Sequence, residues 1–380
     1  MKRVSWWVAP TAAASLVLSL GAAVEEPAAG SPAASAHSTH PSPQDPDVEG
    51  PPGVGRATTT TAPASTAVGS ARAQQLGPGQ FIGFNGLVYD QAPIVVRGTE
   101  SRYLYVGQDF DTACGDGGKF AEGLRHLAQI ARIIERSGRN VAFTVAPNKA
   151  SVDNEDLSQN DLPQGICTEL GLKSQDKTLD TFQDPNYLPL RKTLVDSVVP
   201  TYWHYDTHWT TVGATYYAKA LAHHLSPELA HEQRYGYSIR THIGDLVRLL
   251  YTPIAEDAPA KLPSNGVIVT TDPGSDGYAV EGYVTGDHTW TARPAAKTFK
   301  GHTLLVGDSF TYTALEPLRV LFHHGHFLWI GLSSLDKIIA GIVASRTISI
   351  EVVQRFLSSS VLITKSFRQD LRAALAHSRH

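Results

Sequence analysis

From residue 80 onward, the spacing of apolar residues switches between the two-residue period of a strand and the 3.6-residue period of a helix. Residues 102–106 alternate as a strand does, and residues 120–137 carry apolar side chains at helical spacing. Gly138 follows directly, as is typical of a helix C-terminus. Residues 141–145 then form a continuous apolar run. These segments predict a strand–helix–strand unit.

The same switch of period returns after residue 300. The elements expected there are a strand at 302–306, a helix at 314–323, a strand at 326–330, a helix at 335–343, a strand at 347–353 and a helix at 366–376. Strands that alternate with helices predict an α/β domain with a mostly parallel sheet. Ligands of such sheets bind beyond the carboxyl ends of the strands.

The segment between these two regions has a weaker periodicity of apolar residues. Within the polar stretch 151–200, only residues 188–198 predict a helix. Residues 212–225 predict another helix, with Thr210 or Thr211 as its N-cap.

Residues 252–298 interrupt the alternation of strands and helices. They are rich in glycine and proline and contain only short strands such as 266–270. We expect them to form an insertion over one edge of the sheet.

The N-terminus predicts export. Basic residues at positions 2 and 3 precede an uncharged run from Val4 to Val24, which is typical of a secretory signal at 1–24 and leaves an uncleaved membrane anchor open. Residues 25–78 are mainly Ala, Pro, Ser, Thr and Gly, which predicts a disordered linker. The folded domain is therefore expected at 79–380, outside the cytoplasm, either released or tethered through the N-terminus.

Net charge and cysteine content bear on whether the protein binds nucleic acid and whether it uses a reactive thiol. The 380-residue chain has a net charge of −4, so it lacks the basic footprint of a nucleic-acid-binding protein. Its two cysteines are Cys114 and Cys167. In an exported protein two cysteines pair more often than they react, so we expect a disulfide, with a free reactive thiol as the alternative.

A candidate nucleophile, Ser309, follows the apolar strand at 302–306. Gly307 allows the chain to turn sharply, and Ser309 stands where the next helix begins, beside unpaired backbone N–H groups that suit an oxyanion. The alternative is that Ser309 serves only as a helix N-cap.

A candidate acid–base pair, Asp206 and His208, precedes the helix at 212–225. Residues two apart in an extended segment project to the same side, so Asp206 can fix the tautomer of His208. Together with Ser309, these residues have the composition of a nucleophile–base–acid triad.

A metal site is the rival hypothesis for this segment. His204, Asp206 and His208 alternate as ligands do in an extended chain. A second group that could complete such a site comprises His323, His324 and His326. We interpret this second group as a polar helix end and turn around Gly325. We expect no metal, because a metal site leaves Ser309 without a role.

The two candidate segments resemble a known family. Residues 206–209 read Asp-Thr-His-Trp and residues 307–310 read Gly-Asp-Ser-Phe. This order is similar to that of the SGNH hydrolase-like alginate O-acetyltransferases, a family of exported polysaccharide acetylases with the triad order permuted relative to ordinary SGNH esterases. The resemblance implies that Asp206, His208 and Ser309 form a triad, and that the domain is a three-layer, flavodoxin-like SGNH fold without a cofactor.

Shorter motifs extend the resemblance over most of residues 95–365. The matching segments are 95–98 with 106–110, 146–149, 209–214, 244–246 and 351–356.

The resemblance also implies supporting roles for other residues. Asp308 and Asn148 are expected beside the triad or in the oxyanion hole. For the aromatic side chains, stacking on sugar faces and packing in the core are the two alternatives, and core packing is the commoner one for tryptophan. The aromatic candidates are Trp203, Trp209 and Tyr312. We interpret Arg355 as structural.

We therefore predict an O-acetyltransferase that moves an acetyl group onto hydroxyls of an extracellular or cell-wall polysaccharide. The expected partners are the polysaccharide acceptor and an acetyl donor, which a membrane acyltransferase could supply. Two alternatives stay open: an acetyl esterase of the same fold, and a non-catalytic glycan-binding protein.

Overall fold

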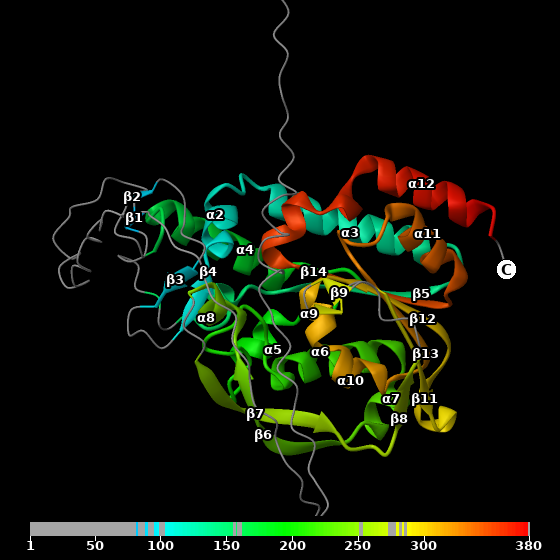
Figure 1. The fold of residues 1–380 in the computed structure, drawn as a ribbon. Helices are drawn as coiled ribbons and strands as arrows, with labels where there is room; N and C mark the ends of the chain where they lie inside the picture. Colours follow the sequence, from blue (N-terminus) through cyan, green and yellow to red (C-terminus); the bar gives the residue numbers. More distant parts are fainter. Residues whose placement is uncertain are drawn as a thin grey trace, which may run out of the picture. The chain divides into compact units, whose positions relative to one another are not determined.

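A six-stranded sheet forms the centre of the described structure, a computed structural model (Figure 1). The residues it describes are 81–82, 88–89, 95–98, 103–154, 157, 162–250, 254–272, 279–280, 283–284 and 287–378, all of which belong to one structural unit. The predicted leader at 1–24 and linker at 25–78 lie outside them. None of the helices in the described ranges has the length and apolar character needed to span a bilayer.

The order of strands in this sheet is β5-β14-β12-β13-β11-β8. Their bounds are Asn140–Ala146, Thr347–Val353, Phe299–Gly307, Phe322–Trp329, Asp287–Arg293 and Ile268–Thr271. The first four strands pair in parallel, whereas β11 pairs antiparallel with both β13 and β8. Every residue of β14 is buried, as expected for an apolar strand covered on both faces.

Helices cover both faces of the sheet (Figure 1). On one face lie α3 (Lys119–Glu135), α11 (Leu335–Ala344) and α12 (Lys365–Ala376), whose apolar side chains join one core cluster. On the other lie α6 (Thr211–Leu225) and α10 (Leu315–Arg319), which contribute to a second cluster. The predicted α/β domain with a mostly parallel sheet is therefore confirmed.

The parallel strands bring three loops to one edge of the sheet. In the register of the sheet, Val353 at the end of β14 lies opposite Ala146 at the end of β5, and Gly307 ends the adjacent strand β12. Because parallel strands end at the same edge, the segments that follow these three residues are neighbours. They contain Asn148, Arg355 and Ser309.

Further elements complete the described fold. They are β1 (Phe81–Ile82), β2 (Val88–Tyr89), β3 (Val95–Arg97), β4 (Leu104–Val106), α2 (Gln108–Cys114), η2 (Lys149–Ser151), α7 (Pro227–Glu232), β6 (Tyr235–Ile243), α8 (Asp245–Leu249), β7 (Ala255–Pro263), β9 (Ala279–Val280), β10 (Tyr283–Val284), η3 (Ala295–Lys297), α9 (Ser309–Thr313), η4 (Gln354–Ser359) and η5 (Val361–Ile363). Strands β6 and β7 pair along their full length as an antiparallel ribbon.

The polar stretch 151–200 contains a helix that the sequence did not predict. Helix α4 spans Ile166–Thr181, and the expected helix at 188–198 shrinks to α5 (Arg191–Val195). The buried residues of α4 are Thr168, Leu172, Gln175 and Leu179. They follow helical spacing, but two of the four are polar, so the apolar period on which the prediction relied is weak.

The helix predicted at 314–323 is wrong at its C-terminal end. The chain forms two short helices, α9 and α10, and strand β13 has already begun at Phe322. His323, His324 and His326 therefore lie within a strand and not in a helix end and turn. Pairing with β12 on one side and β11 on the other overrides the local helical spacing.

The segment 252–298 is more than an insertion over the sheet edge, because β8 and β11 extend the sheet itself. Trp290 of β11 is buried and donates a hydrogen bond from Nε1 to the Arg319 carbonyl oxygen at 3.0 Å. A Cβ atom at Gly325 would lie 2.0 Å from the Trp290 ring, so β13 needs a glycine opposite this side chain.

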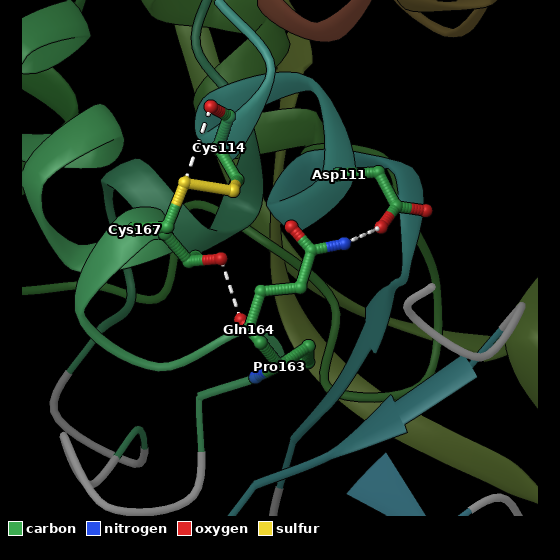
Figure 2. Close-up of a disulfide and its surroundings, with 6 residues drawn as sticks. Asp111, Cys114, Pro163, Gln164 and Cys167 are labelled. Carbon is green, nitrogen blue, oxygen red and sulfur yellow. Dashed lines mark hydrogen bonds between the residues drawn. A yellow bond between two sulfur atoms is a disulfide. The ribbon is translucent and has the colours of Figure 1, made fainter. Parts of the chain in front are cut away.

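The predicted disulfide between Cys114 and Cys167 is present in the structure (Figure 2). It joins the end of α2 to the start of α4, with 4.9 Å between the two Cα atoms. Close by, the side chain of Gln164 donates to Asp111 at 2.6 Å (Figure 2). The bond closes a loop of chain with a sequence separation of 53 residues and so fixes α4 against α2.

We expect that replacing both Cys114 and Cys167 with serine lowers the free energy of unfolding by about 2–4 kcal/mol, because the disulfide restricts the unfolded chain. Denaturant unfolding followed by circular dichroism measures this difference. A reducing agent should destabilise the wild type and leave the double variant unchanged. Equal midpoints for the oxidised wild type and the variant would contradict the expectation.

Candidate functional site

Asp206 and His208 meet inside a tight loop. The predicted extended segment is wrong: residues 204–208 turn, and the loop is closed by hydrogen bonds from Trp203 N to His208 O at 3.3 Å and from Thr210 N to Thr201 O at 2.8 Å. Oδ1 of Asp206 accepts from Nδ1 of His208 at 2.6 Å and from its backbone N–H at 2.8 Å. The turn thereby orients the imidazole with Nδ1 toward the acid.

The second oxygen of Asp206 has two further donors that sequence reasoning missed. Oδ2 accepts from Nε2 of His242 on β6 at 2.8 Å and from the backbone N–H of Asp245 at 2.9 Å. Residues 244–246 matched a short motif of the family, but this match predicted no function for them. His242 carried no signal in the sequence, because its place beside Asp206 depends on how the β6–β7 ribbon folds back.

This arrangement shifts the pKa values of the pair in opposite directions. Burial raises the pKa of Asp206, but the charge and hydrogen bonds of His208, with the bond from His242, outweigh it and hold the pKa well below its ordinary value. Burial lowers the pKa of His208, and the carboxylate of Asp206 more than reverses this, so the pKa is raised. His208 is therefore a stronger base than an isolated histidine.

Asp245 fixes the loop from the other side. Its Oδ1 accepts from Thr207 N at 2.8 Å and its Oδ2 accepts from Thr207 Oγ1 at 2.6 Å. Burial, followed by the nearby charge of Asp206, raises the pKa of Asp245.

The geometry does not assemble the metal site considered from sequence. Nδ1 of His204 lies 2.9 Å from Glu256, not with Asp206 and His208. Among the described residues, a different group, Asp206, His208 and Asp245, has ligand atoms within 4.8 Å of one another. The carboxylate oxygens of Asp206 and Asp245 already accept hydrogen bonds from protein donors, as given above. The other histidines pair elsewhere: His326 contacts Asp287 at 2.5 Å and His323 contacts the Ala292 carbonyl oxygen at 2.7 Å.

A buried lysine supports the same loop from beneath. Nζ of Lys149 donates to the carbonyl oxygens of Leu104, His204 and Asp206 at 2.5, 2.8 and 2.9 Å. Burial lowers the pKa of Lys149 to about 8, against the raising effect of Asp206 and other carboxylates. The turn at 146–149 was matched from sequence, and its lysine proves to be the residue that holds the backbone of Asp206.

Ser309 lies at the carboxyl end of β12, as predicted. It is the first residue of α9, and the N-cap is Asp308, whose Oδ1 accepts from Phe310 N at 2.9 Å and whose Oδ2 accepts from Val353 N at 2.7 Å. The hypothesis that Ser309 serves as the N-cap is therefore wrong, because Asp308 fills that role. The Ser309 side chain is partly exposed and stays available for chemistry.

A buried glutamate shapes the turn before Ser309. Oε2 of Glu351 accepts from Asp308 N at 3.2 Å, Thr311 N at 3.1 Å and Thr311 Oγ1 at 2.8 Å. Burial, followed by the nearby Asp308, raises the pKa of Glu351 well above its ordinary value. Burial also raises the pKa of Asp308, against its backbone donors. A Cβ atom at Gly307 would lie 2.1 Å from Thr311 Oγ1 and 2.9 Å from Glu351 Oε2, so this tight turn requires glycine.

Phe310 brings the two candidate segments together. Its ring centroid lies 5.1 Å from that of His208 and 5.0 Å from that of Trp209. Ser309 therefore directly precedes a side chain packed against the imidazole. Within the described part of the chain, the buried Nε2 of His208 has no hydrogen-bond partner.

Arg355 contacts Phe310, and Asn148 bonds to the backbone of Arg355. Oδ1 of Asn148 accepts from the backbone N–H of Arg355 at 3.1 Å, and the described residues offer no partner to its buried Nδ2. The Arg355 guanidinium lies over the Phe310 ring at 5.4 Å, and its Nη1 is 3.5 Å from Oδ1 of Asp109. Burial raises the pKa of Asp109 to about 6, although Arg355 opposes this. Arg355 thus borders the site, which its structural interpretation did not anticipate.

The aromatic residues considered for sugar binding have different surroundings. Trp209 is 1% exposed and packed in the core, so it has no face free for a sugar. Trp203 is also buried and packs on His242 at 4.7 Å between ring centroids. Tyr312 is partly exposed and its ring packs against that of Trp329 at 5.4 Å between centroids, so it alone of these three is not buried.

A comparison with protein families matches residues 95–277 to the model described as "SGNH hydrolase-like domain, acetyltransferase AlgX". Residues 95–277 are therefore similar to this SGNH hydrolase-like domain. This confirms the resemblance and the SGNH-like fold class predicted from the sequence. The matched range contains Asn148, Asp206, His208 and His242 and ends before Ser309.

Solved structures similar to this chain cover most of its length at low identity. The O-acetyltransferase domain of Pseudomonas putida AlgJ is 18% identical, with 74% of this chain and 99% of that chain covered and a TM-score of 0.44. Bacillus cereus PatB1 with a sulfonyl adduct is 11% identical, with 70% and 98% covered and a TM-score of 0.49. Pseudomonas aeruginosa AlgX is 16% identical, with 74% and 65% covered and a TM-score of 0.44. No curated protein matches the chain.

We expect Asp206→Asn to lower the pKa of His208 by about one pH unit or more, because burial of the imidazole is then no longer opposed by a carboxylate charge. An NMR titration of ¹⁵N-labelled histidine measures this, with His208→Gln identifying the signal. Asp287→Asn is the matched control, since that carboxylate pairs with His326. An unchanged His208 titration in Asp206→Asn would show that the pair does not set the pKa.

Proposed function

We propose that this protein is an O-acetyltransferase in which Ser309, His208 and Asp206 form the catalytic triad. One observation carries the proposal: the imidazole of His208, oriented by Asp206, packs on the residue next to Ser309 and keeps a buried Nε2 without a partner in the described part of the chain. A base with one nitrogen on an acid and the other free is the arrangement that activates a serine. The AlgX-family domain supports the same activity.

In the proposed reaction, Oγ of Ser309 attacks the carbonyl carbon of an acetyl ester while Nε2 of His208 takes the hydroxyl proton. The bond to the leaving oxygen breaks, and His208 returns its proton to that oxygen. A sugar hydroxyl then attacks the acetyl-serine, giving its proton to His208, which passes it back to Ser309. Asp206 stabilises the imidazolium formed in each half of the reaction.

Asn148 is the proposed oxyanion donor. Its Nδ2 is buried without a partner in the described part of the chain, while its Oδ1 is fixed by the Arg355 backbone. Such a preorganised donor stabilises charge that develops on the acetyl oxygen. The backbone N–H of Ser309 is the second proposed donor. Arg355 and Asp308 hold these groups in place, and Tyr312 is proposed to contact the sugar.

The proposed acceptor is a polysaccharide, and its chemistry is not limited to alginate. Support comes from the acetyltransferase name of the family model and from the O-acetyltransferase domain named for AlgJ. Residues 1–24 are proposed to direct export, and residues 25–78 to tether the domain 79–380 outside the cytoplasm. The acetyl donor is proposed to come from a membrane acyltransferase. Hydrolysis of acetyl esters is the second candidate, since water can replace the sugar hydroxyl in the same site.

We expect Ser309→Ala to reduce turnover of a chromogenic acetyl ester by at least about 1,000-fold, because no other group can form the acyl intermediate. Ser366→Ala, a change at an exposed serine of α12, is the matched control. Mass spectrometry should find a sulfonyl fluoride adduct on the peptide that contains Ser309. Oligosaccharides added with the ester should gain acetyl groups if the enzyme is a transferase, and stay unmodified if it is an esterase. Equal turnover by wild type and Ser309→Ala would exclude the serine mechanism.

We expect Asn148→Ala to lower kcat by about 100- to 1,000-fold with a smaller effect on KM, because the lost donor acts mainly in the transition state. Asn186→Ala is the matched control: Asn186 is also buried, and its Nδ2 likewise has no hydrogen-bond partner in the described part of the chain. A similar fall in kcat in both variants would point to a general effect of removing a buried asparagine and would contradict the oxyanion role.

A further inference from the structure

The β6–β7 ribbon presents two side chains to the Asp206 loop. His242 of β6 and Glu256 of β7 are direct partners in the antiparallel register, so their side chains lie on the same face of the ribbon. Nε2 of His242 donates to Oδ2 of Asp206 at 2.8 Å. Oε1 of Glu256 accepts from Tyr205 N at 2.8 Å, and Oε2 accepts from His204 N at 2.8 Å. The ribbon therefore forms hydrogen bonds with three consecutive residues: with His204 and Tyr205 through their backbones, and with Asp206 through its carboxylate.

The contact with His242 decides how the carboxylate of Asp206 is used. His242 and the backbone N–H of Asp245 occupy Oδ2, and the other oxygen, Oδ1, accepts both bonds from His208. The ring of Trp203 packs on His242 and limits its rotation. A carboxylate held by both oxygens cannot swing away from the imidazole of His208.

We propose that His242 is a positioning residue for catalysis, which holds Asp206 in register with His208 and shares its charge. This inference rests on the proposed function of the triad. It is separate from the triad itself, because His242 donates to the acid and not to the base.

Because His208 and His242 both bond to the carboxylate of Asp206, His242 also affects the pKa of His208. A donor at Oδ2 draws negative charge away from Oδ1 and so weakens the support that Asp206 gives to protonated His208. Loss of this donor should raise the pKa of His208. Among the described residues, the other charged or titratable groups around Asp206 and His208 include Asp245, Glu256, His204, Lys149 and Arg355. All of them are retained in the test.

The test compares His242→Leu with His242→Gln in the full chain, by the pH dependence of acetyl ester turnover. The wild-type rate should rise with pH as His208 loses its proton. Glutamine places an amide nitrogen the same number of bonds from Cβ as Nε2 of histidine, so it can still donate to Asp206. We expect His242→Leu to lose about 10- to 100-fold in kcat/KM and to shift the midpoint of the rise to higher pH. His242→Gln should keep most of the rate and the wild-type midpoint.

A second histidine–carboxylate pair provides the control. His326 on β13 bonds to Asp287 and is similarly half-buried, so His326→Leu reports the cost of losing such a pair outside the triad. We expect His326→Leu to keep the wild-type rate and midpoint. Thermal unfolding of each variant shows whether it is folded.

Two outcomes would overturn the inference. One is a folded His242→Leu variant with wild-type kcat/KM and midpoint. The other is a His242→Gln variant as impaired as His242→Leu, since the donor would then not be the cause. If Ser309→Ala retains the wild-type rate, the proposed function fails instead, and this comparison separates the two failures.

Discussion

Four hydrogen-bond donors converge on the carboxylate of Asp206, and the rest of the site is arranged around them. A buried carboxylate without partners would take up a proton, because desolvation disfavours its charged form. The donors keep Asp206 ionised, and the ionised acid in turn raises the pKa of His208. Donors from the loop itself, from β6 and from α8 all contribute, so several separate elements must fold correctly before this one charge is stable.

The parallel sheet brings the other half of the site to this charge. Strands β5, β14 and β12 end at one edge, which places Asn148, Arg355 and Ser309 in neighbouring loops. Phe310 then packs between this edge and the Asp206 loop, in contact with the rings of His208 and Trp209 and with the guanidinium of Arg355. An apolar side chain next to the candidate nucleophile thus holds the two halves of the candidate site together.

The site also contains buried groups that oppose stability. Lys149 is fully enclosed by three carbonyl oxygens, and Glu351 and Asp308 lie together beneath the turn before Ser309. Each of these groups loses hydration on folding, as the direction of its pKa shift shows. Replacement by apolar residues would relieve that cost but would leave the backbone of the Asp206 loop and the N–H groups of the turn without partners. The arrangement favours a fixed backbone over maximal stability.

The sequence by itself determined the alternating strands and helices, the disulfide pair and the two segments that hold Asp206, His208 and Ser309. These features depend on the local spacing of apolar residues or on short motifs, both of which can be recognised within a short stretch of sequence. Helix α4 escaped prediction because half of its buried stripe is polar, and β13 was misassigned in part because strand pairing on both sides outweighs its local spacing.

Only the tertiary structure decided which residues surround the candidate triad. His242, Glu256 and Asp245 reach the loop because the β6–β7 ribbon and α8 fold back on it, and the N-cap proved to be Asp308 rather than Ser309. It also decided between the two alternatives for Trp209, a sugar contact and core packing, in favour of the core. Contacts between residues distant in sequence depend on packing and register across the whole domain, and a local pattern of apolar and polar residues does not contain that information.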